Sequence, residues 1–586
     1  MFVEFDRACF ITSLTIITTK GRTCRIVCRE ADQSNVASSL AQYQYLGNRK
    51  KARNFVLVLL TAAQLGLPRT LEPVIYQNFP DYLYDQPNKP KNRQVSSAMT
   101  VSIFNTLANK KVPLETLEPG LVKLYVCGIT AYDYCHIGHA RSALVFDMLV
   151  RYLRYRDYRV TFVRNFTDID DKIIKRAAEQ QTTCEELSER FIREFHNDMA
   201  ALRTVTPDLE PKATEHVPQI IALIEELIAK GLAYQRGGDV YYRVEKFAGY
   251  GKLSGRQLSD MLAGARVSVN EEKENPMDFA LWKGSKPGEP TWESPWGPGR
   301  PGWHIECSAM SRQYLGDTFD IHGGGKDLVF PHHENEIAQS EGASGKPFAR
   351  NWIHHGFVTI KEEKMSKSLG NFLTIREVLA DHHQEVLRFF VFSTHYRNPL
   401  DYSDSALKDS AVGLERLYSA VAGLDNLPVG NTHAIPSISI AERGKLAGLE
   451  DRFREAMDND LNTAQALGVI FETIKDLNRL RQQLPSPAAP DDLDILKATG
   501  SKLTELSGIM GLLGEAPAAF LLGLRARELS GLTIATGEIE RLIQERLEAR
   551  SAKNWRRADE IRDQLLAAGV ELKDGASGTT WQAKKD

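Results

Sequence analysis

A strand, a helix and a second strand follow one another within about 45 residues of this sequence. The first strand is an apolar run at 121–126, which ends at Cys127. Apolar residues then recur at helical spacing over 136–153, which predicts an amphipathic helix of about five turns, and 159–163 is a second buried run. Strands joined by one helix are parallel, with a right-handed crossover. The pattern therefore predicts a doubly wound α/β fold, whose ligands bind at the carboxyl ends of its strands.

At 586 residues the chain is too long for a single hydrophobic core and should form several domains. A stretch rich in proline and glycine at 283–302 predicts a loop between two lobes. Helical patterns predict a bundle after about Leu407, with helices over 407–424, 442–457 and 464–484. A separate terminal module is predicted from two helical patterns within 539–567 and a hairpin around Asp574-Gly575.

Residues 1–98 differ from the rest of the chain. They carry 13 Lys and Arg against 7 Asp and Glu, and they end in a turn-rich stretch at 85–93 that is followed by Met99. From Met99 the sequence has the pattern of a compact enzyme. We expect residues 1–98 to be a dispensable extension or the product of a translation start placed too far upstream, and we favour the second interpretation.

Composition narrows the class of protein. The chain is 42% hydrophobic and 25% charged, as globular proteins are, and its longest apolar run, at 55–60, falls far short of the roughly 20 residues of a membrane span. Glu4 and Asp6 argue against a secretory signal. Seven irregularly spaced cysteines do not make a disulfide framework, so one or two could be metal ligands. We expect a cytoplasmic protein with no membrane segment.

Two histidines frame the start of the predicted helix, in the motif His136-Ile-Gly-His139. The N-terminus of a helix attracts anions such as phosphate. Gly138 would let a nucleotide approach closely, and the two imidazoles could donate hydrogen bonds to phosphoryl oxygens as their charge grows. Taken alone, two histidines at this place are more often ordinary polar capping residues.

A second motif, Lys364-Met-Ser-Lys-Ser368, precedes a glycine at Gly370. Lysine is a mobile point charge, which suits a leaving pyrophosphate. Any single such pentamer is more often a solvated basic loop. The two motifs occur in this order about 230 residues apart in one doubly wound chain, and this pairing favours the functional interpretation.

A metal site can be argued from spacing. His332 and Glu336 lie four residues apart, after Pro331, which we predict to be the first residue of a helix, so both would lie on one helix face. Cys307 precedes them, and Cys127 follows the first predicted strand. Two thiolates, an imidazole and a carboxylate suit zinc. The alternatives are a surface His-Glu pair and buried cysteines that act as small hydrophobes.

The two motifs match the signature sequences of class I aminoacyl-tRNA synthetases, and other stretches narrow the resemblance to the cysteinyl-tRNA synthetases. These stretches are Tyr125-Val-Cys-Gly-Ile-Thr130, Asn165-Phe-Thr-Asp-Ile-Asp-Asp-Lys172, Gly302-Trp-His-Ile-Glu-Cys-Ser-Ala-Met310, His322-Gly-Gly-Gly325 and Phe330-Pro-His-His-Glu-Asn-Glu336. The resemblance extends from Met99 to about Trp581 and does not include residues 1–98.

The resemblance implies a role for each matched residue. The catalytic residues would be His136, His139, Lys364 and Lys367, and the ATP-binding residues would be His136, Gly138, His139, Gly324 and Lys367. Thr167 and Trp303 would line the amino-acid pocket, although a strand hydroxyl and a core indole are the plain alternatives. One zinc ion would be held by Cys127, Cys307, His332 and Glu336. Arg550, Trp555, Asp559 and Asp574 would face the anticodon, where an aromatic ring can stack on an exposed base; each could equally be a solvated residue.

The resemblance also implies the reaction and the partners. The cysteine carboxylate would attack the α-phosphate of ATP, with magnesium on the phosphates, and the acyl group would pass to the 3′ end of tRNA(Cys). Zinc would select a thiolate over the hydroxyl of serine, so no editing domain is expected. We expect a monomer. Two alternatives remain: a ligase that joins cysteine to an amino-sugar on the same catalytic fold, and a non-catalytic zinc protein that binds tRNA.

These expectations give a domain plan for the whole chain. A doubly wound, Rossmann-like catalytic domain with an inserted connective domain would precede an α-helical bundle and a small mixed α/β module. The predicted ranges are 1–98 for the extension, 99–208 and 302–342 for the two catalytic halves, 209–301 for the insertion, 343–409 for a stem-contact region with the lysine motif, 410–515 for the bundle and 516–586 for the anticodon module.

Overall fold

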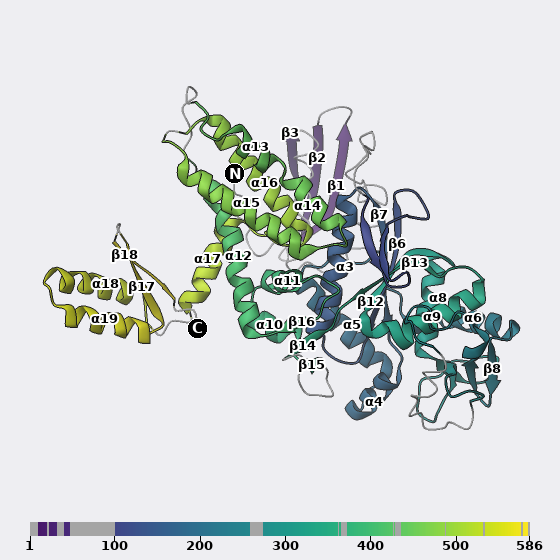
Figure 1. Ribbon diagram of the computed structural model, residues 1–586. Coiled ribbons are helices and arrows are strands. Elements are labelled where there is room, and N and C mark those ends of the chain that lie inside the picture. The colour runs from purple at the N-terminus through teal and green to yellow at the C-terminus, as the bar shows by residue number, and fades with distance from the viewer. Residues whose placement is uncertain are drawn as a thin grey trace. The chain divides into compact units, whose positions relative to one another are not determined.

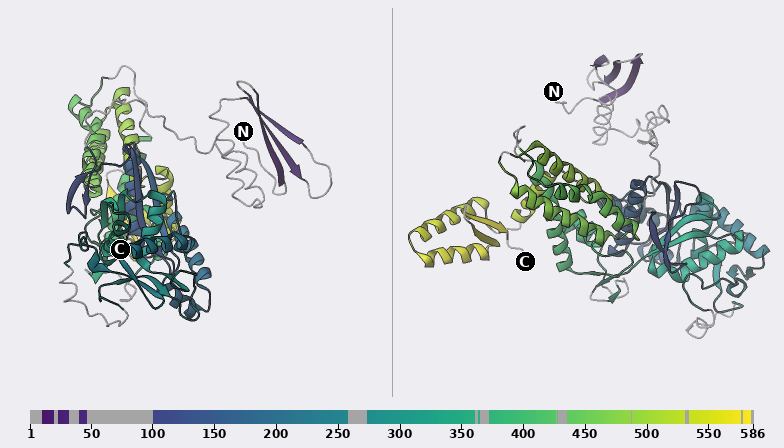
Figure 2. Two further views of the ribbon diagram at one scale, coloured as in Figure 1. Left: turned by 90° about the vertical axis from the view of Figure 1, so that its right-hand side faces the viewer. Right: turned by 45° about the horizontal axis from the view of Figure 1, so that its top comes forward.

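A computed structural model describes residues 10–19, 23–31, 40–46, 100–257, 273–360, 363–364, 372–425, 427, 435–486, 488–530, 534–575 and 578–583. The chain divides into two compact units, Met1–Ala98 and Met99–Asp586, which are taken separately. In the first unit, the strands β1 (Phe10–Thr19), β2 (Thr23–Ala31) and β3 (Leu40–Leu46) form an antiparallel sheet in that order (Figure 1). Figure 2 shows these purple strands from two further sides.

The centre of the second unit is a parallel sheet of four strands in the order β13-β12-β6-β7 (Figure 1). Their bounds are β6 (Leu121–Thr130), β7 (Arg159–Thr167), β12 (Phe319–Gly325) and β13 (Ala349–His355). Helix α3 (Ile137–Tyr155) joins β6 to β7, which confirms the predicted strand-helix-strand unit. The chain first adds β7 on one side of β6 and later adds β12 on the other. Between β6 and β12 the winding reverses, and doubly wound folds bind ligands at such a point.

Alternation along β6 assigns its side chains to two different cores. Val122, Leu124 and Val126 pack in the same hydrophobic cluster as the buried face of α3. Tyr125 and Cys127 belong to the cluster on the other face, together with Cys307 and Met310 of helix α8 (Trp303–Leu315). Because side chains alternate along a strand, Tyr125 and Cys127 face α8, and this alternation holds as far as the register shift between Val126 and Ile129.

An inserted lobe lies between the two halves of the parallel sheet. It has an antiparallel sheet in the order β11-β10-β9-β8, with β8 (Ala233–Arg236), β9 (Asp239–Tyr242), β10 (Phe279–Gly284) and β11 (Gly299–Pro301). Helix α6 (Val217–Ala229) packs on it through the same hydrophobic cluster. The loop predicted for 283–302 is therefore the connection between β10 and β11, and both of its ends belong to the sheet.

Further elements surround this core. They are β4 (Ser102–Asn105), β5 (Lys110–Pro113), α4 (Asp171–Gln180), α5 (Cys184–Ala201), a π-helical turn (Val329–His333), α9 (Glu334–Ser344), α10 (Ile375–Asp381) and α11 (Gln384–Phe392), with 3-10 turns at Ala213–His216, Val244–Lys246 and Lys326–Leu328. Strands β14 (Val358–Ile360), β15 (Glu363–Lys364) and β16 (Leu400–Tyr402) form a small sheet in the order β15-β14-β16.

Helices dominate the rest of the chain, as the sequence predicts. They are α12 (Asp404–Asp425), α13 (Ile440–Ala447), α14 (Leu449–Asp458), α15 (Thr463–Gln483), α16 (Pro490–Ile509) and α17 (Pro517–Ser530). The single helix predicted over 442–457 is instead two helices, which meet at Gly448. Of the helices in the part of the chain that the structure describes, none is long and apolar enough to cross a membrane.

The terminal module consists of α18 (Thr536–Ser551), α19 (Trp555–Ala567) and the hairpin of β17 (Val570–Gly575) and β18 (Gly578–Ala583), which are the two helices and the hairpin predicted (Figure 1). It has its own hydrophobic cluster, built around Ile539, Ile561 and Val570. Helix α17 packs elsewhere: the ring of Phe520 stacks on that of Tyr418 in α12, with centroids 3.7 Å apart. The core of the module therefore begins after α17.

A buried ion pair joins the helical region to the catalytic core. Asp147 of α3 accepts a hydrogen bond from Arg388 Nη1 of α11 at 2.7 Å, and both side chains are almost fully buried. The same guanidinium donates to the carbonyl oxygens of Leu202, at the end of α5, and Met510, at the end of α16. Arg388 thus satisfies helix-end carbonyls that would otherwise be buried without a donor.

This ion pair predicts the first effect of a substitution. Asp147→Asn would leave the Arg388 guanidinium buried without a countercharge, so the folded state of the second unit should lose about 3–5 kcal/mol. Calorimetry should show a clearly lower melting temperature.

Arg151→Gln is the matched control, because Arg151 also pairs with Asp147 but is 29% exposed. It should cost no more than about 1 kcal/mol. Equal effects of the two substitutions would contradict a special role for the buried pair.

Candidate active site

The start of helix α3 is capped by both histidines of the first motif. The backbone N–H of Gly138 donates to His136 Nδ1 at 3.1 Å, and the backbone N–H of His136 donates to His139 Nδ1 at 3.1 Å. The two rings stack with their centroids 4.0 Å apart. A neutral imidazole that accepts at Nδ1 carries its proton on Nε2. The capping role and the donor role are therefore compatible, because capping makes Nε2 of each ring a donor.

Gly138 has a reason within the motif itself. A Cβ built on it would lie 2.8 Å from Cε1 and 2.9 Å from Nδ1 of His136, closer than non-bonded atoms can come. Glycine is thus required for the His136 ring to fold over the first turn. The sequence suggested close approach of a nucleotide instead; the structure gives a reason that needs no ligand.

The chain that follows the lysine motif returns to this helix start. The N–H of Ile137 donates to the carbonyl of Leu373, and the N–H of Ile375 donates to the carbonyl of Cys135, each at 3.0 Å. Lys364 is the last residue of β15, where its backbone pairs with Thr359. Lys367 and the rest of the motif lie outside the described residues.

Four predicted metal ligands come together from four different elements. Cys127 lies in β6, where the pairing with β7 shifts register between Val126 and Ile129. The other three are Cys307 of α8, His332 of the π-helical turn and Glu336 of α9, and the ligand atoms of all four lie within 4.8 Å of one another. The two Sγ atoms are 3.8 Å apart, and His332 Nε2 is 3.0 Å from Glu336 Oε1.

The helical face that carries this set differs in detail from the prediction. Pro331 is not the first residue of an α-helix: it lies inside the π-helical turn Val329–His333, and α9 begins only at Glu334. The contact between His332 and Glu336 forms nevertheless, because the π turn leads directly into α9.

A second set of ligands shares two members with the first. Cys127, His322, His333 and Glu336 also bring their ligand atoms within 4.8 Å of one another. His322 Nε2 lies 2.8 Å from Glu336 Oε2, and His333 Nε2 lies 3.3 Å from Cys127 Sγ. Sequence reasoning passed over these two histidines as ligands, although both stand in the motifs that carry the resemblance. The two adjacent histidines, His332 and His333, were the sequence signal that could have indicated a second ligand.

Electrostatics in the first set favour a bound cation. Burial and the neighbouring Cys307 raise the pKa of the Cys127 thiol, whereas the hydrogen bond with Cys127 lowers the pKa of Cys307 to about 6. Burial alone would lower the pKa of His332, but Glu336 and Cys307 outweigh it and raise it to about 10. The Cys307 thiolate and the Glu336 carboxylate thus lie beside one added proton, which His332 carries, so negative charge is in excess. Two sulfurs, an imidazole and a carboxylate are donors that zinc accepts, and zinc would take the place of that proton.

Of the two predicted pocket residues, Trp303 contacts a metal ligand and Thr167 contacts Glu306, the residue before Cys307. The Trp303 ring stacks on the His332 ring with centroids 4.3 Å apart, and it keeps 38% of its surface exposed. Thr167 is the last residue of β7, and its buried hydroxyl donates to Glu306 Oε2 at 2.8 Å. Gly324 of β12 is also buried, and a Cβ there would lie 2.8 Å from Cε1 of His333. This glycine therefore has a packing role next to the second ligand set.

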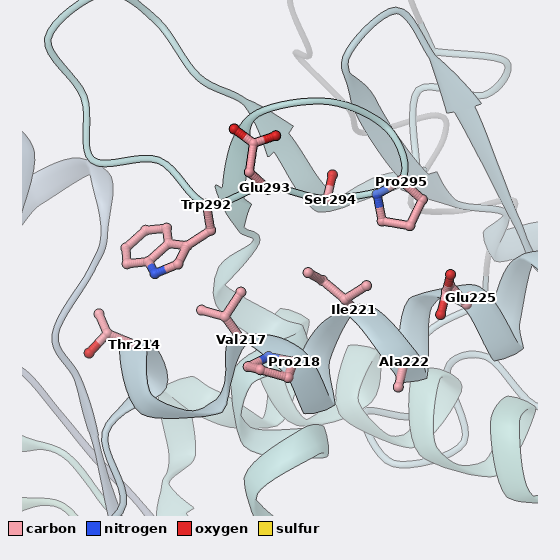
Figure 3. A pocket seen from close by; sticks show the side chains of 10 residues that line it. All are labelled: Thr214, Val217, Pro218, Ile221, Ala222, Glu225, Trp292, Glu293, Ser294 and Pro295. Carbon is pink, nitrogen blue, oxygen red and sulfur yellow. The ribbon is translucent and has the colours of Figure 1, made fainter.

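Two hollows mark the surface around these elements. A small cavity of about 50 Å³ lies at the end of β6, and its lining includes Cys127, Gly128 and His139. A larger, open groove lies in the inserted lobe, between the first turns of α6 and the segment Trp292 to Pro295 (Figure 3). The larger groove contains no predicted site residue, so the larger of the two hollows is not where the predicted active site lies.

The four predicted anticodon residues have different surroundings in the terminal module. Trp555, the first residue of α19, is 59% exposed. Asp574 accepts two hydrogen bonds from Arg546, each at 2.9 Å, and one from Arg550 at 2.7 Å, and these arginines hold its pKa far below the usual range. Asp559 pairs with Arg562 at 3.1 Å. Arg550 and Asp574 thus already bind each other, whereas Trp555 offers an open ring face.

Three regions of the chain match models of known protein families. Residues 113–412 match the model of the class I tRNA synthetase (C) catalytic domain, 452–514 match the DALR domain, and 535–581 match the cysteinyl-tRNA ligase anticodon binding domain. The cysteine–tRNA ligase of Desulfotalea psychrophila (strain LSv54 / DSM 12343) is 61% identical over 487 residues, which cover 83% of this chain and 100% of that protein. This chain belongs to the cysteine–tRNA ligase family.

Other members of this family and one solved structure extend the comparison. The cysteine–tRNA ligase of Geobacter sulfurreducens (strain ATCC 51573 / DSM 12127 / PCA) is 57% identical over 486 residues, which cover 83% of this chain and 100% of that protein. Mycobacterium tuberculosis methionyl-tRNA synthetase in complex with methionyl-adenylate aligns with a TM-score of 0.51 at 18% identity, over 70% of this chain and 94% of that one. At 18% identity, this likeness supports the fold of the chain and nothing about its substrate.

The two overlapping ligand sets generate the second prediction. Cys307→Ser removes a thiolate that only the first set uses, so most bound zinc should be lost, as measured by metal analysis of the purified protein. His333→Asn removes a ligand that only the second set uses, and zinc content should stay near that of the unaltered protein.

Cys184→Ser is the matched control, because this half-buried thiol belongs to neither set. Full zinc content in Cys307→Ser together with loss in His333→Asn would assign the metal to the second set.

Proposed function

We propose that this chain is a cysteine–tRNA ligase, an enzyme that activates L-cysteine with ATP and transfers it to the 3′ end of tRNA(Cys). One observation carries the proposal beyond family membership. The thiolate-containing ligand set of Cys127, Cys307, His332 and Glu336 lies at the carboxyl end of β6, the strand that leads through residues 131–136 into the capped helix α3. The proposed thiol-selecting centre and the proposed phosphate-binding helix start would therefore lie at the same edge of the sheet.

Zinc would be held by these four residues. When bound, it would supply preference for a thiolate over an alcohol, since a metal that accepts sulfur ligands binds serine poorly at neutral pH. The chain's own residues would do the rest of the recognition. Trp303 stacks on His332 and keeps an exposed face, so it can cover a small side chain. Thr167 supplies a hydroxyl that is hydrogen-bonded to Glu306, the residue before Cys307.

Catalysis of adenylate formation would rest on position and charge. His136 and His139 present Nε2 donors at the start of α3, where the helix dipole also favours an anion. In the proposed reaction the cysteine carboxylate attacks the α-phosphate and pyrophosphate leaves, while both imidazoles donate to phosphoryl oxygens. Lys364, Lys367 and magnesium would neutralise the leaving group, and Gly324 would lie beneath the adenosine.

Recognition of tRNA would use the helical bundle and the terminal module. Trp555 has the exposed ring that stacking on an unpaired base requires. Arg550, Asp559 and Asp574 are held in ion pairs, so they would present fixed polar edges to the anticodon. We propose one protein chain and one tRNA per complex.

The two alternatives lack support. An amino-sugar ligase on this catalytic fold would not carry the long helical region, whereas this chain has matched domains at 452–514 and 535–581. A non-catalytic protein that binds tRNA would be expected to have lost one of the two signature motifs, and both are complete in the sequence.

Exchange of pyrophosphate into ATP with each amino acid in turn tests the proposed function directly. Cysteine should support exchange, and serine should support it at least about 1000-fold less well, because losing the metal–thiolate bond should cost several kcal/mol. A chain that begins at Met99 should do the same, since the resemblance starts there. Exchange with another amino acid would contradict the proposed specificity for cysteine. Inactivity of the chain from Met99 would contradict the expectation that residues 1–98 are dispensable.

Removal of the terminal module should separate the two half-reactions. A chain that ends at Ser530 keeps α17 on the Tyr418 ring and should retain cysteine-dependent exchange, whereas charging of tRNA should fall. In the complete chain, Trp555→Ala should weaken tRNA binding roughly 5- to 150-fold, the usual range for one stacked base.

Trp581→Ala is the matched control for Trp555→Ala, because Trp581 packs in the hydrophobic cluster of the same module. Trp581→Ala should lower the melting temperature of the module, and any loss of tRNA binding should follow from that loss of stability. Trp555→Ala should weaken tRNA binding without lowering the melting temperature. Full charging by the chain that ends at Ser530 would remove the anticodon role.

A further inference from the structure

Glu306 is a fully buried acidic side chain that the proposed mechanism has not used. It lies in the first turn of α8, between Trp303 and Cys307. Its Oε2 accepts the hydrogen bond from the Thr167 hydroxyl at 2.8 Å, whereas its Oε1 has no hydrogen-bond partner within the described chain. A buried carboxylate oxygen without a donor destabilises the fold, so stability does not explain a glutamate at this position.

The contact with Glu306 determines how Thr167 can interact with a ligand. A hydroxyl has one hydrogen and two lone pairs. Because the hydrogen of Thr167 is donated to Glu306, only the lone pairs remain, and the hydroxyl oxygen can act toward a ligand as an acceptor alone. A threonine without such a partner could rotate to donate or to accept.

The substrate group that matches a fixed acceptor is an ammonium. An ammonium group has three donors and no acceptor. In cysteine the thiol and the α-ammonium sit on neighbouring carbons, so a ligand whose thiol lies at Cys127 and Cys307 carries its ammonium close by. Thr167 ends β7, the strand paired with β6, and it lies opposite Thr130, three residues after Cys127.

We infer that Glu306 is a positioning residue for amino-acid binding, which holds the Thr167 hydroxyl as an acceptor for the α-ammonium of the substrate. The inference rests on the proposed function, because it takes the ligand to be cysteine. Glu306 touches Thr167 rather than the substrate, and its effect should therefore depend on whether the ligand carries an ammonium.

Two small thiols separate this role from a general structural one. Cysteamine carries a thiol and an ammonium, whereas 2-mercaptoethanol carries a thiol and a hydroxyl. Calorimetric titration of the zinc-loaded full chain should show that Glu306→Met weakens cysteamine binding about 10-fold or more, equivalent to about 1.4 kcal/mol. Binding of 2-mercaptoethanol should change less than about 2-fold. Glu306→Gln keeps a carbonyl acceptor for Thr167 and should restore cysteamine binding.

Thr167→Val provides an independent measurement if Glu306→Met loses zinc or fails to fold. It removes the acceptor itself, so it should weaken cysteamine selectively. Adding Glu306→Met to it should cost little more. In pyrophosphate exchange, Thr167→Val should raise KM for cysteine while kcat changes only a few fold.

Equal weakening of both thiols, failure of Glu306→Gln to restore binding, or additive losses in the double variant would each overturn the inference. Failure of the unaltered chain to bind either thiol or to exchange with cysteine would overturn the proposed function instead. Normal cysteamine binding by both Glu306→Met and Thr167→Val would overturn the role of Glu306 alone.

Discussion

The contact between Asp147 and Arg388 is the constraint on which the arrangement of the second unit depends. Arg388 reaches the carboxylate of α3 and the last carbonyls of α5 and α16 at once, so one guanidinium fixes three helices around α11. Gly511 lies directly after α16 with a positive φ of 67°, and a Cβ there would come within 2.4 Å of Arg388 Nη1. The joint therefore requires both the arginine and a residue with no side chain beside it.

The same helix α3 that receives Arg388 begins at the two capping histidines. Helix α3 therefore connects the helical bundle to the two histidines that are proposed to donate to phosphate. On the opposite face of the sheet, the alternation of β6 brings Cys127 to α8 and α9. The two faces of β6 therefore have different tasks: Val122, Leu124 and Val126 pack with helix α3, and Cys127 joins the ligand cluster.

Much of this organisation could be predicted from the sequence. The strand-helix-strand unit, the helical region and the terminal hairpin follow from hydrophobic period and turn residues, which are local signals. The meeting of Cys127 with Glu336 came from resemblance, because contacts between residues about 200 positions apart leave no local trace. The π-helical turn at Pro331 and the break at Gly448 were missed, since a helical period does not show where a helix is interrupted. His322 and His333 were missed because one complete ligand set already satisfied the chemistry.

The collision that a side chain at position 138 would have with the His136 ring bears on how this sequence can evolve. A larger residue at 138 is excluded for as long as an imidazole occupies 136, and the exclusion disappears if 136 becomes small. The coupling between the two positions runs one way: glycine at 138 leaves position 136 free to vary, whereas position 138 can become larger only after 136 changes. A larger residue at 138 in a distant relative would therefore indicate that the imidazole at 136 had been replaced first.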